Sequence, residues 1–211
     1  MNRGSAELSR PGWRRNVLCV VLEIATLFLS VRPLVCAGSA GTGAVEVAAQ
    51  PAGDTTNLVG KTAPAFVLRN LGGMYRSLGD WCYTGEEKAG KPRNVVVLDF
   101  FSVDCEPCKR EMTNFLSVAA EFKGKGALFF VVCTDPPSRE DDVRKLVETM
   151  KIDCDVLCDS YRVAFDRFGL ERIPRTVVVG KNRKILGVIA GAHDDFEKTL
   201  RDTVSSAVSG K

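Results

Sequence analysis

The segment Val95–Glu111 constrains the fold of this chain most, because it joins an apolar run directly to a Cys-x-x-Cys pair. Residues 95–101 are apolar apart from Asp99, and a β-branched run of this length is typical of a buried strand. Apolar residues with helical spacing follow at Met112, Phe115, Leu116, Ala119 and Phe122. The pair Cys105 and Cys108 is therefore expected at the junction between a strand and a helix.

This position suits the two thiols to disulfide exchange. If the helix begins near Cys105, the sulfur of that residue lies at the exposed helix N-terminus, where free backbone N–H groups and the macrodipole stabilise a thiolate. The sulfur of Cys108 then lies one turn into the helix, within reach of a mixed disulfide formed at Cys105. Pro107 fits the first turn because the N–H group that it lacks has no helical partner there. Cys105 is thus the expected nucleophile and Cys108 the resolving thiol.

A zinc half-site and a structural disulfide are other uses of a Cys-x-x-Cys pair. Zinc needs a second cysteine pair or histidines at ligand spacing. The chain has one histidine, His193, and three residues separate Cys154 from Cys158. We therefore expect no metal and no cofactor beyond a redox-active disulfide between Cys105 and Cys108. A copper chaperone is an alternative, although such proteins usually bring histidine or methionine at ligand spacing.

Two segments resemble the thioredoxin superfamily. Residues 99–109, Asp-Phe-Phe-Ser-Val-Asp-Cys-Glu-Pro-Cys-Lys, are similar to its active-site strand, loop and helix start. Cys-Glu-Pro-Cys followed by Lys-Arg-Glu especially resembles the TlpA/ResA-type extracytoplasmic thiol:disulfide oxidoreductases. Later in the chain, residues 173–176, Ile-Pro-Arg-Thr, resemble the cis-proline loop of the family. The resemblance implies an α/β fold: a three-layer sandwich with a mixed central sheet, helices on both faces and an N-terminal β-hairpin.

Two carboxylates join the thiols as candidate catalytic residues. By the resemblance, Asp99 stands where thioredoxins have a buried aspartate that passes a proton to the second cysteine. Glu111 matches the glutamate that tunes the cysteines in ResA-like proteins. Because Glu111 follows Cys108 by three residues, the two share one face of a helix. Compensation of the helix dipole is the alternative role for an acid near a helix start.

The resemblance also implies a substrate-binding groove. Pro174 would have a cis peptide bond beside the two sulfurs, and the backbone of Ile173 would pair with a bound peptide. Glu106 and Pro107, between the two cysteines, complete the expected substrate-binding set. The substrate implied is a thiol or disulfide of a partner protein.

The residue before the first cysteine departs from the family pattern, which usually has tryptophan where this chain has Asp104. Cys105 is thus flanked by Asp104 and Glu106, whose negative charges oppose formation of a thiolate. A less stabilised thiolate means a less stabilised reduced form and a more reducing pair. We therefore expect a reductant of partner disulfides. By resemblance, a membrane protein supplies the electrons, and a frequent target is an apocytochrome awaiting haem, as in cytochrome c maturation.

Two further functions are alternatives to this one. A peroxiredoxin-like peroxidase shares the N-terminal segment that starts at Val59, but its usual Pro-x-x-x-Thr-x-x-Cys pattern has Leu98 and Ser102 in place of proline and threonine. A thioredoxin-like module that only binds its partners has no need of both an intact Cys-x-x-Cys pair and Pro174. Both observations favour an oxidoreductase.

The N-terminal region has the order of a secretory signal. Residues 1–15 are polar and basic, residues 17–31 are mostly apolar, and small residues follow. We expect residues 1–37 to be a signal peptide or membrane anchor, residues 38–57 a flexible linker and residues 58–211 one thioredoxin-like domain. The domain would then act in the periplasm or on the outer face of the membrane. The formal net charge of +3 is too small to favour a nucleic-acid partner.

Local patterns predict the remaining elements. Gly72 and Gly73 predict the turn of the N-terminal hairpin, Ser138 predicts a helix N-cap, and residues 161–168 predict a short helix. Further strands are expected at residues 127–133, 155–158, 176–179 and 185–190, and a closing helix has apolar residues at Phe196, Leu200 and Val204.

The cysteines outside the Cys-x-x-Cys pair leave one question open. Cys133 and Cys158 each end an apolar strand, and these strands are neighbours in such a fold, so the two thiols could approach each other. The alternative is that each is a small buried hydrophobic residue. We expect His193, which follows the last strand, to be a surface or capping residue.

Overall fold

The computed structural model describes residues 56–83, 93–191 and 193–210 of the chain. The expected signal segment and most of the expected linker lie outside these residues, so their boundaries stay predictions. Within the described ranges, no helix combines the length and the apolar character that a membrane span requires.

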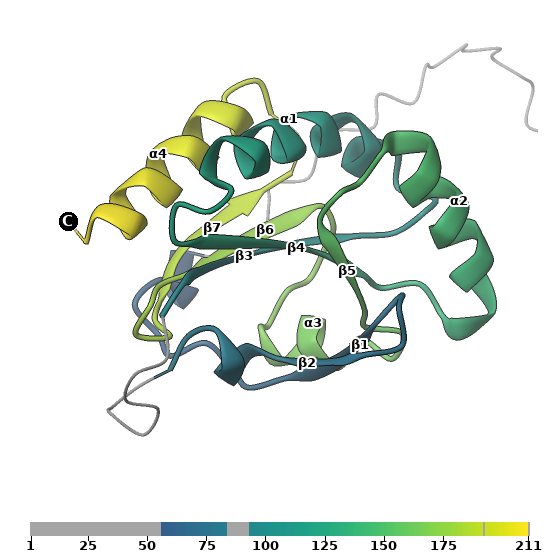
Figure 1. Cartoon of the computed structure of the whole chain (residues 1–211), viewed down its shortest axis with the longest axis horizontal. Coiled ribbons are helices and arrows are strands. Elements are labelled where there is room, and N and C mark those ends of the chain that lie inside the picture. Colours follow the sequence, from purple (N-terminus) through teal and green to yellow (C-terminus); the bar gives the residue numbers. More distant parts are fainter. Residues whose placement is uncertain (1–55, 84–92, 192, 211) are drawn as a thin grey trace, which may run out of the picture. The chain divides into compact units, whose positions relative to one another are not determined.

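A seven-stranded mixed sheet forms the centre of the fold (Figure 1). Its strands are β1 (Val67–Asn70), β2 (Tyr75–Ser77), β3 (Val95–Phe101), β4 (Ala127–Cys133), β5 (Asp155–Cys158), β6 (Arg175–Val179) and β7 (Ile185–Ala190). They lie in the order β2-β1-β5-β4-β3-β6-β7, with β3, β4 and β5 parallel and every other pair antiparallel. All seven residues of β3 are buried, and the strand lies in the interior of the sheet between β4 and β6.

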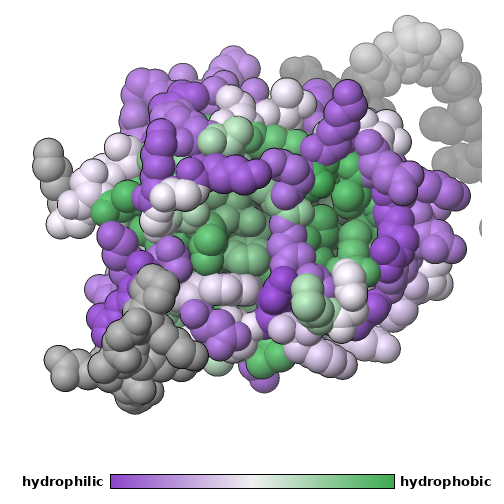
Figure 2. All heavy atoms as spheres, viewed as in Figure 1, coloured by the Kyte–Doolittle hydropathy of each residue, from purple (hydrophilic) through white to green (hydrophobic). Residues whose placement is uncertain are grey.

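Helices cover both faces of the sheet, as expected for a three-layer sandwich (Figure 1). They are α1 (Glu106–Phe122), α2 (Glu140–Met150), α3 (Val163–Arg167) and α4 (Phe196–Ser209). The core on one face contains Phe115 of α1, Val143 of α2 and Leu200 of α4. The core on the other face contains Phe165 of α3. On the face seen in Figure 2, apolar residues gather in the middle and hydrophilic residues surround them.

The N-terminal hairpin has its turn at the predicted glycines. Strands β1 and β2 pair antiparallel, with Arg69 opposite Tyr75, and Gly73 in the turn has a φ of +86°. A residue without a side chain adopts this left-handed conformation without strain, which explains glycine there. The α/β fold expected from the sequence is thus confirmed, hairpin included.

Two helix starts differ from the local predictions. Ser138 is not an N-cap: it lies in a 3-10 turn, and α2 begins one residue after Arg139, which provides no side-chain cap. Acidic residues in the first turn of α2 compensate the helix dipole instead. The predicted helix at residues 161–168 is shorter, because Arg162 has a φ of +56° and α3 starts after it. The carboxylate of Asp159 accepts hydrogen bonds from the backbone N–H groups of Ala164 and Phe165 in the first turn of α3.

Candidate active site

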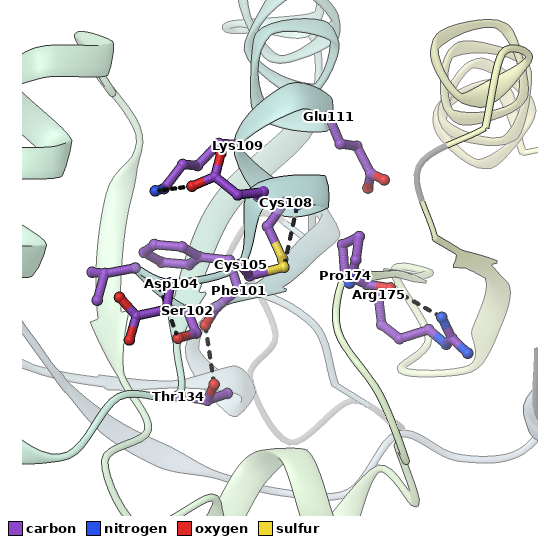
Figure 3. The surroundings of a disulfide bond; sticks show 12 residues. Phe101, Ser102, Asp104, Cys105, Cys108, Lys109, Glu111, Thr134, Pro174 and Arg175 are labelled. Atoms are coloured by element: carbon purple, nitrogen blue, oxygen red, sulfur yellow. Dashed lines mark hydrogen bonds and ion pairs between the residues drawn. A yellow bond between two sulfur atoms is a disulfide. The ribbon is translucent and has the colours of Figure 1, made fainter. Parts of the chain in front are cut away.

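The two cysteines of the Cys-x-x-Cys pair differ in exposure. Cys105 is the N-cap of α1 and is partly exposed, whereas Cys108 lies in the first turn and is completely buried. They form a disulfide, with their Cα atoms 5.3 Å apart, and the backbone N–H of Cys108 donates to Sγ of Cys105 at 3.2 Å (Figure 3). A molecule approaching from solvent therefore meets the sulfur of Cys105 first. This is the asymmetry that a nucleophile and a resolving thiol require.

The loop before β6 borders the disulfide. It has the expected cis peptide bond between Ile173 and Pro174, and Figure 3 draws Pro174 among the residues that surround the disulfide. Arg175 is buried, and its Nη1 donates to the carbonyl of Pro174 at 3.0 Å. Arg175 thus holds the carbonyl of Pro174 in place. Among the described residues, Ile173 forms no hydrogen bond with another backbone group.

Asp99 and Glu111 meet in one buried site. Asp99 comes from β3 and Glu111 from α1, and Thr176 of β6 lies between them. The hydroxyl Oγ1 of Thr176 is 2.9 Å from Oδ1 of Asp99 and 3.4 Å from Oε1 of Glu111. The second oxygen of each carboxyl group is buried and has no hydrogen-bond partner among the described residues. The pair is therefore short of hydrogen bonds to stabilise two negative charges.

This shortage determines how the two carboxyl groups bind protons. Burial raises the pKa of Asp99 to about 7, and the hydrogen bond from Thr176 opposes the rise. Burial, followed by the negative charge of Asp99, raises the pKa of Glu111 to about 8, against the effects of Thr176 and Arg175. Two interacting acids of this kind titrate as a pair. Near neutral pH they hold about one proton between them, so the site can accept or release a proton.

The acids that flank Cys105 have cationic partners. Both oxygens of Asp104 accept hydrogen bonds from the guanidinium of Arg139, at 2.8 and 3.1 Å, and this contact lowers the pKa of Asp104. Glu106 forms an ion pair with Lys109 at 2.7 Å. The repulsion that these two acids exert on a Cys105 thiolate is therefore smaller than the sequence alone indicates. Glu106 and Pro107 are exposed at the helix start, beside the cysteines.

Replacing Arg139 by alanine is expected to slow alkylation of reduced Cys105 at neutral pH by less than about tenfold, because Asp104 loses its cation but stays exposed to solvent and salt. Iodoacetamide kinetics at low and high salt measure this effect, which salt should diminish. The Arg144→Ala variant, which removes another exposed arginine from the same helix region, is the control. Equal rates for the Arg139 variant and the unmodified chain at low salt would contradict the prediction.

Asp135, which the sequence analysis missed, supports the loop that leads to Cys105. Its buried carboxylate accepts hydrogen bonds from the hydroxyl of Ser102 at 2.8 Å and from the backbone N–H of Val103 at 2.9 Å. It also accepts one from the thiol of Cys133 at 3.2 Å. Asp135 follows β4, so it joins the carboxyl ends of two parallel strands. An aspartate just after a buried strand was the one local signal for this role.

A disulfide at a helix start beside a cis-proline loop, within a thioredoxin-like sandwich, defines a thioredoxin-like thiol–disulfide oxidoreductase. The AhpC/TSA family model matches residues 59–188, and the chain belongs to this family. It is 28% identical over 137 residues to thiol-disulfide oxidoreductase ResA of Geobacillus thermodenitrificans. The matched segment covers 65% of this chain and 72% of that relative.

Two solved structures are similar in the same region. One is the thioredoxin domain of a thiol-disulfide oxidoreductase from Bacteroides vulgatus, with 26% identity, a TM-score of 0.58 and coverage of 69% of this chain and 97% of that one. The other is a thiol:disulfide interchange protein from a Bacteroides species, with 26% identity, a TM-score of 0.57 and coverage of 72% and 93%. Both likenesses agree with the fold and with the enzyme class that the site defines.

Proposed function

We propose that the protein reduces disulfides of partner proteins outside the cytoplasm, with Cys105 and Cys108 as its catalytic pair. The observation that carries this proposal is the asymmetry of the two sulfurs: one is open to solvent at a helix N-terminus, and the other is buried one turn behind it. The name of the relative, thiol-disulfide oxidoreductase ResA, supports the reaction class.

The reaction has two exchanges. The Cys105 thiolate attacks one sulfur of the partner disulfide, which forms a mixed disulfide and releases the first partner thiol after protonation. Cys108 then attacks Sγ of Cys105 and releases the second thiol. In total, the partner disulfide gains two electrons and two protons, and Cys105 and Cys108 become a disulfide.

The buried carboxylates serve the second exchange in this mechanism. Cys108 must lose its proton inside the protein, where Glu111 lies one turn further along the same helix and Asp99 lies behind it. A carboxylate pair that holds about one proton near neutral pH is matched to that transfer. Glu111 and Asp99 thus act as the base for the resolving thiol.

The same pair supports the direction of electron flow. Any negative charge on Asp99 or Glu111 disfavours a thiolate nearby, and therefore disfavours the reduced form of the cysteines. This effect does not depend on the flanking acids, whose charges are balanced by Arg139 and Lys109. The dithiol is consequently a reductant in the proposed function.

The partner binds along the cis-proline loop. Ile173 offers its backbone to an extended peptide, Pro174 packs beside the mixed disulfide, and Glu106 and Pro107 border the attacking sulfur. We propose a membrane protein as the electron donor and a cytochrome c maturation type of role. The basic and apolar residues 1–37 support export by a signal peptide or a retained anchor, which would tether the domain through its linker.

The reduction potential of the Cys105–Cys108 pair tests the proposed direction. We expect a value near that of thioredoxin, about −270 mV. Equilibration in dithiol redox buffers, followed by alkylation and mass measurement of the peptide that contains both cysteines, gives this potential, and Cys105→Ser is the control. A value near that of strong disulfide donors, about −120 mV, would reverse the proposed direction.

The structure disfavours a peroxidase as the main activity. The hydroxyl of Ser102, at the position of the peroxiredoxin threonine, is bound to Asp135. Cys105 is also paired with a second cysteine three residues away. Consumption of hydrogen peroxide by the reduced protein, compared with its rate of disulfide reduction, separates the two functions.

A further inference from the structure

We propose that Cys133 and Cys158 form a second redox-active pair, which takes disulfides as oxidants and is coupled to the Cys105 loop through Asp135. The two cysteines lie directly opposite each other in the parallel pairing of β4 and β5. Neighbouring strands are about 4.8 Å apart, and the Cα atoms of disulfide-bonded cysteines are about 4.4–6.8 Å apart. The backbone therefore already has the spacing that a disulfide needs.

The two side chains also point to the same face of the sheet. Side chains two residues apart on a strand share a face, and Val131 and Val156, two residues before each cysteine, both belong to the core beneath α1 and α2. Cys133 and Cys158 line one small cavity together with Asp135. Both are free thiols in this structure.

The thiols differ in access, as the cysteines of an exchange pair should. Cys158 is partly exposed and borders a surface groove of about 360 Å³, in which Tyr75 and Tyr161 are 75% and 80% exposed. Cys133 is 2% exposed, and its thiol donates to Oδ2 of Asp135 at 3.2 Å. Cys158 is thus the thiol that an oxidant reaches, and Cys133 is the one that completes the bond.

The proposed reaction balances without any metal or oxygen. Cys158 attacks a disulfide R–S–S–R, which forms a mixed disulfide and releases one R–SH. Cys133 then attacks Sγ of Cys158 while its proton passes through the Asp135 carboxylate to the leaving sulfur, so the second R–SH leaves and Asp135 is a carboxylate again. The two cysteines lose two electrons and two protons, and the oxidant gains them. Burial raises the pKa of the Cys158 thiol, so this pair should react more slowly than an exposed thiol.

Asp135 connects this pair to the candidate active site. In the reduced form its carboxylate accepts from the thiol of Cys133, the hydroxyl of Ser102 and the backbone N–H of Val103. Oxidation removes the first of these donors, because a disulfide has no S–H group. The carboxylate is then held by the Ser102–Val103 loop alone, and that loop ends at Cys105.

The site is tested in the full chain with Cys105→Ser and Cys108→Ser, so that the outcome does not depend on the proposed function. The folded protein is incubated with oxidised glutathione, blocked with N-ethylmaleimide and digested. We expect mass spectrometry to find the Cys133 and Cys158 peptides joined by a disulfide. Adding Cys133→Ser should leave glutathione on Cys158, and adding Cys154→Ser should change nothing. Free or separately modified thiols at both positions would overturn the proposal.

The coupling is tested in the same Cys105→Ser, Cys108→Ser chain, in which neither active-site thiol can react with the oxidant. Hydrogen exchange of the backbone N–H of Val103, which donates to Asp135, is measured with the Cys133–Cys158 pair reduced and then oxidised. We expect the exchange rate to change by about threefold or more, because the Asp135 carboxylate loses the hydrogen bond from the Cys133 thiol. Adding Cys133→Ser, which prevents the disulfide, should give one rate under both conditions. Equal rates before and after oxidation in the chain that keeps Cys133 would overturn the coupling.

Discussion

Replacing Cys105 by serine is expected to lower disulfide reductase activity by about a thousandfold or more. Removal of a covalent nucleophile typically lowers the rate of an enzyme by at least this factor. The serine hydroxyl is almost fully protonated at neutral pH, so the first exchange with the partner disulfide cannot start. Reduction of insulin disulfides with dithiothreitol as the electron source measures the loss. The Cys154→Ser variant, which changes a cysteine outside the site, should keep its activity.

Replacing Cys108 by serine should have a different outcome when the reduced variant, freed of dithiothreitol, is mixed with insulin. The first exchange proceeds at Cys105, but the buried thiol that would release the partner is missing, so the mixed disulfide accumulates. Non-reducing electrophoresis should show a covalent adduct with the substrate protein that dithiothreitol removes. Absence of an adduct, or full turnover by the Cys105→Ser variant, would contradict the proposed roles of the two cysteines.

Local patterns in the sequence were sufficient to locate the thiols. The β-branched run of β3 and the apolar spacing of α1 depend on nearest neighbours along the chain, so they predict a strand and a helix without knowledge of the rest of the fold. The position of Cys105 at the helix N-terminus follows from those two elements. The cis bond at Pro174 followed from the resemblance and not from local pattern, since an isolated Ile-Pro bond is usually trans.

The contacts around the thiols could not be predicted in the same way. Thr176 reaches Asp99 because β6 pairs antiparallel with β3 in a register that places these residues opposite each other. Arg139 neutralises Asp104 only because the turn before α2 returns to the loop before α1. Both contacts join segments that are distant in sequence. Ser138 is a case in which the local pattern was misleading. Serine is a good N-cap residue, but the two prolines before it place it in a 3-10 turn instead of at the start of α2.

The buried acid pair should make the protein less stable as the pH rises, in contrast to an acid held in an ion pair. Asp99 and Glu111 have raised pKa values of about 7 and 8 when folded, and values near 3.8 and 4.5 as model groups. Between about pH 4 and 8 the folded state therefore binds protons that the unfolded state has released. Stability is greatest below this window and falls as the pH rises through it.

Replacing both acids by their amides, Asp99→Asn with Glu111→Gln, should remove this pH dependence and stabilise the protein at pH 8 by several kcal/mol, up to about 4 kcal/mol for each acid, since one pKa unit corresponds to about 1.4 kcal/mol. The same variant should resolve the mixed disulfide at least about tenfold more slowly, because Cys108 loses its base. Urea unfolding from pH 4 to 9 and single-turnover reduction measure the two effects. Glu121→Gln, at an exposed position of α1, is the control. A chain that gains stability but resolves the mixed disulfide at the unmodified rate would show that the two acids destabilise the fold without serving Cys108.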